Sequence, residues 1–553
     1  MQIVVPMSGF GERFRKAGYS IPKPLIDVDG KPIVAHVIDM FPGEKDFIFI
    51  CNQEHLDEPS YEMASILKKY CPTGRIVGIP SHKLGPIYAV LQAIKEIDLN
   101  QPVVVNYCDF TCFWNWDHFK KFVSETACMG AIPAYRGFHP HSLGSTNYAY
   151  IQEVNGWVLD IQEKQPYTND RMNEFASSGT YYFASAKLMK DAFERVVDKD
   201  LNVGGEFYVS LAYKPLLENH TPIAVYPIQH FMQWGTPEDL AEYRVWSDVF
   251  MRLIKPASDT NEQDGALIMP MAGLGQRFKS EGYKITKPLI PVSGVPMVAQ
   301  AMHDLPQTSR QVFVLREDMP GYQDVVTELV KKYPNSIIKI IQQVTEGQAC
   351  TALIGLDALQ ENNIESDELP VTIGACDNGM LYSATRLQDM ILDPKIDVIV
   401  WGVRGHPNAI RHPKMFGWIS EQGGKISSIS VKESLVNPKI DPIVLGTFTF
   451  KRAKNFRKAV NQLIGRNGTT NGEFYIDAAI NDAIALGLNC YLFEVDSYLS
   501  WGTPSDLQTF EYWQSCFHKW GGHHYRLECD SRIPLSRVRY LQDKYREIIP
   551  VMP

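Results

Sequence analysis

The sequence repeats itself over a very long period. Residues 3–34 read IVVPMSGFGERFRKAGYSIPKPLIDVDGKPIV, and residues 267–298 read LIMPMAGLGQRFKSEGYKITKPLIPVSGVPMV. Two later segments also recur in the same order: GGEFYV with NGEFYI, and MQWGTPEDL with LSWGTPSDL. The offset is 264 residues in the first pair (273 minus 9) and 267 in the later ones (473 minus 206). A period of this length is too long for a solenoid and predicts that a whole domain has been duplicated.

The repeat also sets the expected domain bounds. We expect a first domain at residues 1–254 and a second at 266–517, joined by the polar, turn-rich linker KPASDTNEQDG at 255–265. Residues 518–553 have no counterpart in the first half and form a C-terminal extension. Two roles for the extension remain open: an arm over the domain interface, or a helix used for homo-oligomer formation.

Within each half, short apolar runs alternate with helical patterns. IVVPM, FIFIC, RIVGI and VVVNY, at residues 3–7, 47–51, 75–79 and 103–107, have the composition of buried parallel strands. The segment IYAVLQAI at 87–94 has helical spacing. This alternation predicts an α/β fold: two tandem Rossmann-like domains, each a mostly parallel sheet flanked by helices.

Charge, hydropathy and cysteine usage exclude several classes of partner. The net charge of −9 over 553 residues gives no basic field, so we expect no nucleic-acid partner. No run of about 18 apolar residues occurs, which predicts no membrane span. Cys108 and Cys112 lack the further ligands of a zinc motif, and the ten cysteines follow no framework. We expect reduced, structural thiols and a cytoplasmic protein.

The first strand of each half leads into a G-x-G-x-R loop. Glycines let the backbone approach a ligand and point its amides at an anion, which suits a phosphate. A tight strand-to-helix turn would explain one such loop by itself. Here the loop occurs twice, each time with a Lys-Pro pair ten residues after the arginine. Phe14 and Phe278 replace the third glycine of a dinucleotide-binding loop, and no Gly-Lys-Ser/Thr of a P-loop follows.

The pattern G-x-G-x-R…P-K-P-L…G-K-P, with a G-x-x-x-A-V-x-x-A-I helix and an aspartate after a buried strand, resembles the sugar-phosphate nucleotidyltransferase superfamily. G-E-F-Y and W-G-T-P-x-D-L bring it nearest to capsule-associated and phosphocholine-type members. The resemblance covers roughly residues 1–250 and 266–517. It implies GT-A-like domains in an enzyme that transfers NMP from an NTP to a phosphorylated sugar or small phospho-acceptor. It further implies pyrophosphate release, Mg²⁺, and a role in surface polysaccharide precursor synthesis.

The resemblance also assigns roles to individual residues. Catalytic cations are implied at Arg13, Lys23, Arg277 and Lys287, and Mg²⁺ ligands at Asp109 and Asp377. Nucleotide-binding glycines are implied at Gly9, Gly11, Gly85, Gly273, Gly275 and Gly347. Acceptor-side residues are implied at Lys164, Gly179, Glu206, Lys432, Gly446 and Glu473. Simpler readings remain: the aspartates could cap the next turn, and the two glutamates could start a helix.

Some positions depart from the family pattern. Many members have a second Mg²⁺ aspartate two residues before the glycine of G-T-P, where this chain has Gln233 and Ser500. Asp496 is a candidate replacement in the second half; otherwise the metal is held by one aspartate and the triphosphate, or a half is impaired. Three loop residues also differ between the halves: Glu12 and Gln276, Lys31 and Val295, Glu163 and Val431. We expect the first half to be catalytically complete. The alternative is a nucleotide-binding regulator or scaffold.

Overall fold

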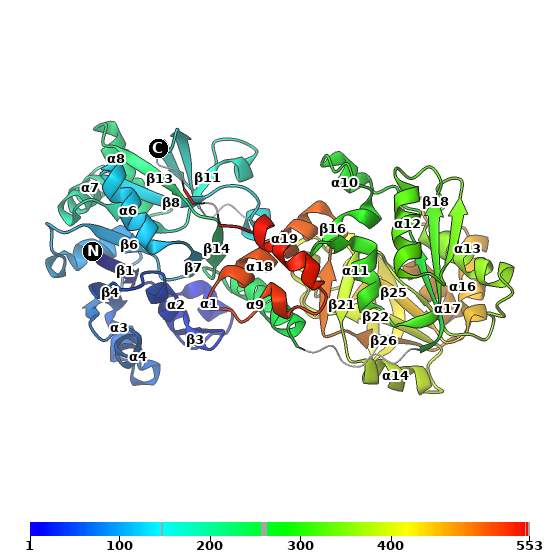
Figure 1. The fold of residues 1–553 in the computed structure, drawn as a ribbon. Coiled ribbons are helices and arrows are strands. Elements are labelled where there is room, and N and C mark those ends of the chain that lie inside the picture. The colour runs from blue at the N-terminus through cyan, green and yellow to red at the C-terminus, as the bar shows by residue number, and fades with distance from the viewer. Residues whose placement is uncertain (145–147, 256–262, 548, 551–553) are drawn as a thin grey trace. The chain divides into compact units, whose positions relative to one another are not determined.

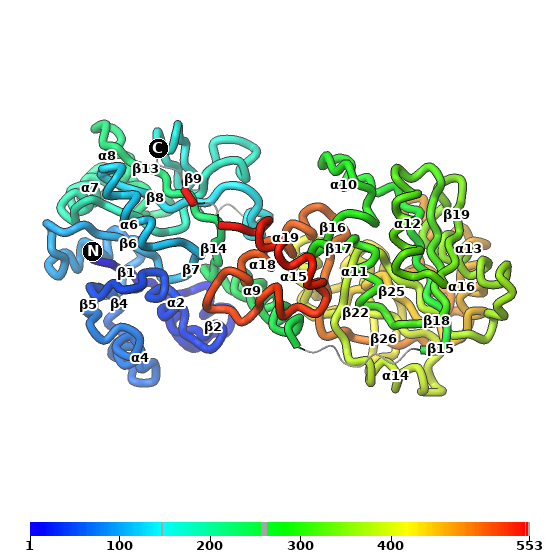
Figure 2. The backbone as a smooth tube through the Cα atoms, in the orientation of Figure 1, coloured from blue at the N-terminus to red at the C-terminus, as the bar shows by residue number. Residues whose placement is uncertain are grey.

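The structure is a computed structural model that describes residues 1–144, 148–255, 263–547 and 549–550. The chain divides into two compact units, drawn in Figures 1 and 2. The first unit contains Met1–Asp248, Ser515–His524 and the described residues from Arg546 onward. The second contains Val249–Gln514 and Tyr525–Tyr545. Most of the expected linker, residues 256–262, lies outside the described residues, and the linker bounds stay a prediction.

The first unit is built on one large sheet with the strand order β11-β9-β10-β13-β8-β12-β6-β1-β4-β5. The four strands expected from the sequence are neighbours in it and run parallel: β1 (Gln2–Met7), β4 (Phe47–Asn52), β5 (Arg75–Ile79) and β6 (Val103–Asn106). The other strands are β8 (Gly130–Tyr135), β9 (Ala149–Val154), β10 (Trp157–Glu163), β11 (Phe175–Ser177), β12 (Thr180–Phe183) and β13 (Ile223–Pro227). The α/β class is confirmed.

The sheet as a whole is mixed rather than mostly parallel. Strand β12 runs antiparallel to both β6 and β8, and β9 and β10 form an antiparallel hairpin. The hairpin turns at Asn155 and Gly156, which both have positive φ (50° and 81°). Such a turn joins two strands without a crossover helix, and antiparallel pairing is the geometry it permits. The alternation of apolar runs with helical patterns in the sequence predicted only the parallel part of the sheet.

Helices cover both faces of this sheet. Alternate residues of β1 belong to different cores: Ile3 and Val5 to one, Val4 to the other. The first core includes side chains of α2 (Ile33–Asp39), α4 (Met63–Tyr70) and α6 (Trp116–Thr126). The second includes side chains of α5 (Pro86–Gln92), α7 (Ala186–Asp198) and α8 (Tyr213–Glu218). The β1 strand is therefore buried on both sides, which explains its unbroken apolar sequence.

The second unit repeats the architecture. Its sheet has the order β19-β18-β15-β20-β25-β22-β26-β24-β23, which is the order of the first sheet with one long strand in place of β11 and β12. The strands are β15 (Gln263–Pro270), β18 (Thr308–Arg316), β19 (Ile337–Ile341), β20 (Val371–Ile373), β22 (Val398–Val403), β23 (Gly417–Gln422), β24 (Lys425–Val431), β25 (Ile443–Phe450) and β26 (Cys490–Glu494). Its flanking helices are α11 (Met297–Asp304), α12 (Tyr322–Lys332), α13 (Gln348–Glu361), α14 (Ala384–Leu392), α16 (Ala453–Gly465) and α17 (Ile476–Ala485).

A two-stranded ribbon accompanies each large sheet. In the first unit β7 (Phe110–Phe113) pairs with β14 (His230–Gln233), and in the second β21 (Asn378–Leu381) pairs with β27 (Ser497–Ser500). Each ribbon joins the strand-end aspartate to the W-G-T-P motif, which leads into α9 (Pro237–Leu253) or α18 (Pro504–Lys519). A final helix, α19 (Leu535–Lys544), lies in the C-terminal segment. None of the helices in the described ranges is long and apolar enough to cross a membrane.

Candidate functional site

The glycine loop of each unit connects a buried strand to a short helix. Gly11 and Gly275 have φ of 63° and 62°, the left-handed region that glycine adopts at little cost, and they cap α1 (Glu12–Lys16) and α10 (Gln276–Ser280). Gly9 and Gly273 serve a different purpose, because a Cβ at either position would meet nothing within 4 Å. These two glycines leave free space beside the loop backbone.

The lysine and aspartate of each unit form an ion pair at the end of the sheet. Lys23 Nζ lies 2.8 Å from Asp109 Oδ2, and Lys287 Nζ lies 2.6 Å from Asp377 Oδ2. Burial lowers the pKa of both lysines, but the facing carboxylate outweighs it and holds each lysine pKa above its usual value. Burial raises the pKa of Asp377, and the charge of Lys287 outweighs that and lowers the pKa. The ion pair of Lys287 and Asp377 is therefore fully charged near neutral pH.

The W-G-T-P motif packs directly on each aspartate. Trp234 N donates to the Asp109 carbonyl at 2.8 Å, and Trp501 N donates to the Asp377 carbonyl at 2.9 Å. The following glycine has a tight fit: a Cβ on Gly235 would lie 3.2 Å from Asp109 Oδ2. A side chain there would crowd the carboxylate, which explains why the motif has glycine.

Gly85 and the G-E-F-Y motif, far apart in the sequence, meet in the structure. A Cβ on Gly85 would lie 2.7 Å from the Phe207 backbone nitrogen, and Gly85 has φ of 86°. Phe207 N donates to the Leu84 carbonyl at 2.9 Å, which binds the two segments together. Gly347 stands in the same relation to Phe474, 2.5 Å away. Both glycines are thus required by close backbone packing beside the cleft.

The expected acceptor-side lysines adopt a strained backbone conformation. Lys164 and Lys432 have φ of 60° and 59°, unusual for a residue with a long side chain. Lys164 Nζ donates to Tyr208 Oη at 2.5 Å, and Tyr208 in turn donates to Glu206. Lys432 Nζ donates to Tyr475 Oη at 2.7 Å. Strain repeated at matched positions is typical of functional sites, where the surroundings over-determine the conformation.

The remaining two glycines lie close to the strand that precedes the aspartate. A Cβ on Gly179 would lie 3.1 Å from the ring of Tyr107, and one on Gly446 would lie 3.5 Å from the Cβ of Ala375. Both glycines have positive φ, 98° and 73°. They allow the chain to turn between the pocket and the sheet, where a side chain would be strained.

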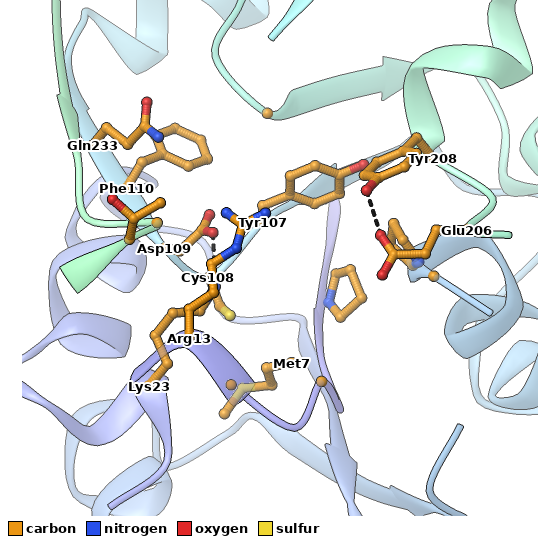
Figure 3. A pocket seen from close by; sticks show the side chains of 18 of the residues that line it. Met7, Arg13, Lys23, Tyr107, Cys108, Asp109, Phe110, Glu206, Tyr208 and Gln233 are labelled. Carbon is orange, nitrogen blue, oxygen red and sulfur yellow. Dashed lines mark hydrogen bonds and ion pairs between the residues drawn. The ribbon is translucent and has the colours of Figure 1, made fainter. Parts of the chain in front are cut away.

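In the first unit these residues surround one cavity of about 510 Å³. The expected site residues that line it are Gly9, Gly11, Arg13, Lys23, Gly85, Asp109, Lys164, Gly179 and Glu206, which is the full first-half set. Figure 3 shows the Arg13 side chain extending into the space beside Asp109, with Tyr208 and Glu206 on the opposite wall. The structure therefore gathers the first-half residues in one place, whereas their roles stay predictions.

In the second unit the equivalent contacts recur. Lys287 pairs with Asp377, and Arg277 is close enough for its charge to lower the pKa of both. Lys432 reaches the tyrosine of G-E-F-Y, and Gly347 packs on the same motif. Glu473 is exposed, while its counterpart Glu206 is half-buried and bonded to Tyr208.

Asp496 does not supply a second metal carboxylate. It pairs with Arg386 at 3.0 Å, and its backbone nitrogen donates to Leu381, at the end of the ribbon opposite to Asp377. Four residues of strand, roughly 13 Å, separate that end from Ser500. The expectation for Asp496 is wrong because the register of the ribbon places it at the far end from Asp377, too distant for the two carboxylates to bind one ion.

The acid nearest the missing aspartate comes from the helix that follows. Gln233 Nε2 donates to Asp239 Oδ2 at 2.9 Å, and Asp239 also binds the Thr236 hydroxyl at 2.7 Å. Asp506 makes the equivalent bond to Thr503 at 2.7 Å. Burial raises the pKa of Asp506, which also feels the charge of Asp377. Both acids belong to the T-P-x-D motif, which is the sequence signal that could have predicted them.

Among the described residues, no cluster of three or more histidine, cysteine, aspartate or glutamate side chains forms a ready-made metal cage. Magnesium does not need one, because it keeps several waters and is bound in proteins through one or two carboxylates plus substrate phosphates. Asp109 lines the cavity, and its carboxylate is satisfied by Lys23. The donor set therefore fits a magnesium ion that arrives with a nucleotide.

Comparison with known proteins gives one family and several distant relatives. The family model of the MobA-like NTP transferase domain matches residues 3–167. The chain is 24% identical over 226 residues to the bifunctional protein GlmU of Methanococcus maripaludis, covering 40% of this chain and 47% of that protein. It is 22% identical over 247 residues to mannose-1-phosphate guanyltransferase beta-B of Xenopus laevis, covering 43% and 62%. The chain thus spans about half to three fifths of the length of these curated relatives.

Two solved structures resemble single halves of the chain in length. One is the nucleoside-diphosphate-sugar pyrophosphorylase from Vibrio cholerae RC9, with 19% identity and a TM-score of 0.37, covering 44% of this chain and 98% of that chain. Another is the inositol-1-phosphate CTP transferase from T. maritima, with 15% identity and a TM-score of 0.36, covering 46% and 96%.

The family match begins at the glycine loop and extends past the strand-end aspartate to the acceptor-side lysine. It therefore includes Arg13, Lys23, Asp109 and Lys164, four of the charged residues that line the first cavity. Residues 3–167 match the MobA-like NTP transferase domain, and over less than half of its length the chain is similar to sugar-phosphate nucleotidyltransferases.

Proposed function

We propose that the chain transfers a nucleotidyl group from an NTP to a phosphorylated small-molecule acceptor and releases pyrophosphate. The observation that carries this proposal is that Arg13, Lys23, Asp109 and Lys164 line one cavity. The glycine loop also lines this cavity, and Gly9 leaves open space beside its backbone. In-line attack on an α-phosphate brings anions together, so catalysis requires fixed cations, amides and a metal more than a covalent nucleophile.

We assign a different role to each of these residues according to its position in the cavity. Arg13 faces the loop and suits the departing pyrophosphate, because a guanidinium binds phosphate oxygens in pairs. Lys23, held by Asp109, is placed for the α-phosphate. Lys164 lies on the far wall, bonded to Tyr208, and is placed for the acceptor phosphate. When bound, Mg²⁺ would be held by Asp109 or Asp377 and would neutralise charge on the nucleotide phosphates.

The capsule or surface polysaccharide role remains part of this proposal. The relatives named above include a mannose-1-phosphate guanyltransferase and an inositol-1-phosphate CTP transferase, and a phosphorylated sugar or polyol is the acceptor class that we propose here. Capsule-associated members are the nearest by motif, which is the basis for the pathway. We propose a cytoplasmic site of action, where NTPs are available.

The test is pyrophosphate release. We expect release when the full chain meets the correct NTP, acceptor phosphate and Mg²⁺, and we expect its loss in the Asp109→Asn, Asp377→Asn double variant. Tight nucleotide binding without turnover across a broad panel of NTPs and phospho-acceptors would instead establish the alternative, a nucleotide-binding regulator or scaffold.

A further inference from the structure

The acceptor end of the cleft differs between the two units in a set of linked positions. Glu163, at the end of β10, corresponds to Val431 at the end of β24. Ser210, two residues after the G-E-F-Y motif, corresponds to Asp477. Compared with the first unit, the second unit lacks the carboxylate at the end of the strand and has one on the segment that follows G-E-F-Y.

In the first unit, positions 163 and 210 face each other. Ser210 Oγ donates to Glu163 Oε2 at 2.6 Å. Glu163 lines the cavity beside its cross-strand partner Ala149, and the charge of Lys164 acts on its carboxylate. The acid therefore lies at the acceptor-side lysine, supported by a hydroxyl from the G-E-F-Y segment.

In the second unit, the carboxylate approaches the same strand pair from the opposite element. Val431 pairs with Gly417, the counterpart of Ala149. A Cβ on Gly417 would collide with the Asp477 carboxylate, so the alanine of the first unit would force that carboxylate to move. The charge of Lys432 acts on Asp477, as that of Lys164 acts on Glu163. The three exchanges are therefore mutually dependent and keep one acid beside the acceptor-side lysine.

The acid in the second unit has unused hydrogen-bonding capacity. Its own backbone N–H is the donor that reaches it, and among the described residues no other chain group donates to its carboxylate. Burial raises the pKa of Asp477 to about 6. A carboxylate kept half-buried with few donors is costly unless a ligand supplies them.

We infer that Asp477 is the acceptor-binding carboxylate of the second unit, in place of Glu163, and that it accepts hydrogen bonds from hydroxyl groups of a phosphorylated sugar or polyol. Lys432 binds the phosphate of that molecule. A phosphorylated amine fits less well, because Lys432 already places a cation beside the acid and would repel a second one. This inference rests on the proposed function for the identity of the acceptor end of the cleft.

The test measures equilibrium binding rather than turnover. In a full-length Lys164→Ala background, which removes the acceptor lysine of the first unit, glucose 1-phosphate, mannose 1-phosphate, inositol 1-phosphate and phosphocholine are titrated by calorimetry. We expect at least one hydroxylated phosphate to bind. Asp477→Asn, which keeps the size of the side chain, should weaken that binding about tenfold and change phosphocholine binding little.

A grafted arrangement provides the rescue. The triple change Gly417→Ala, Val431→Glu and Asp477→Ser copies the first unit and should return the affinity to within about threefold of the background. The melting temperature of each variant shows whether it is folded. If the triple variant does not fold, the near-isosteric Asp477→Asn variant decides the test by itself.

Three outcomes would overturn the inference: no hydroxylated phosphate binds, Asp477→Asn leaves the affinity unchanged, or only phosphocholine binding falls. Failure of the proposed function is a separate result, because absent pyrophosphate release together with Asp477-dependent binding would remove the activity and keep the acceptor site. Normal pyrophosphate release together with binding that does not depend on Asp477 would keep the activity and remove the acceptor site.

Discussion

The two units share a sheet order and a set of contacts beside the glycine loop, yet they differ around Lys164 and Lys432. The lysine–aspartate ion pair, the loop glycine with positive φ and the backbone hydrogen bond of the W-G-T-P motif occur in both units with similar distances and angles. At the acceptor end, Tyr107 and Tyr181 of the first unit correspond to Ala375 and Phe448 of the second. Duplication has thus conserved the part that would hold the nucleotide and varied the part that would choose the acceptor.

The second unit has a smaller side chain at the first of these two positions and a hydroxyl at neither. Tyr107 Oη accepts a hydrogen bond from Val209 N at 3.1 Å, and its ring packs edge-on against Tyr181. Ala375 leaves that volume unfilled by its own side chain. We therefore expect the two units to prefer different acceptors, the second a larger one.

The largest expected effect separates the units by activity. Asp109→Asn should lower pyrophosphate release by about 10²–10³-fold, because it removes a fixed charge and the partner of Lys23. The matched variant Asp377→Asn should lower release less with an acceptor preferred by the first unit. An unchanged rate in Asp109→Asn would contradict the assignment of that activity to the first unit.

The next effect concerns folding at the glycines that pack on G-E-F-Y. Gly85→Ala or Gly347→Ala should lower the free energy of unfolding by about 3 kcal/mol, because the backbone conformation is left-handed and the new Cβ meets the Phe207 or Phe474 backbone. Denaturant titration measures the change. Gly9→Ala is the control: it has open space and should change stability by less than about 0.5 kcal/mol while weakening nucleotide binding. Equal losses in all three would contradict this reading of the loop.

A smaller effect comes from the titration of Asp477. Its native pKa of about 6 lies above the usual 3.8, so the native state holds the proton more tightly and stability falls as pH rises from about 4 to 6. Relative to wild type, Asp477→Asn should gain stability over that window, on the order of 2 kcal/mol, and then stay level.

Denaturation curves at a series of pH values test this expectation. The charged group that acts on Asp477 is Lys432, which lowers the pKa of the carboxyl against the effect of burial. Glu163→Gln is the matched variant, and it should shift stability in the same direction, because burial also raises the pKa of Glu163. Parallel curves for wild type and Asp477→Asn would show that the carboxyl is not perturbed.

The smallest effect concerns the missing second aspartate. Gln233→Asp should lower the Mg²⁺ concentration needed for half-maximal activity by about threefold, because a hard cation prefers carboxylates. Without metal, the new charge beside Asp239 and Asp109 should lower the melting temperature, and Mg²⁺ should restore it. Gln233→Asn is the control for side-chain length. A Mg²⁺ dependence identical in both variants would show that this position does not face the metal.

Local signals in the sequence were enough for the α/β class, the parallel strands and the residues around the first cavity. Glycine loops, strand-end aspartates and Lys-Pro pairs are short motifs whose meaning depends on neighbours within a few residues, and a duplicated chain presents each one twice. For that reason Arg13, Lys23 and Asp109 could be selected before any coordinates were known.

Other features depend on which side chains meet across strands, and no local pattern encodes them. The place of the antiparallel strand β12 between β6 and β8 is one such feature, and Asp496 lies at the wrong end of a ribbon whose register decides its distance from Asp377. The exchange of Glu163 for Asp477 is invisible in an aligned motif, because the acid moves between elements that touch only in three dimensions. The sequence by itself determined the duplicated α/β fold and the residues that line the first cavity; the tertiary structure decided which side chains meet beside Lys164 and Lys432, since contacts between distant segments fix that part of each unit.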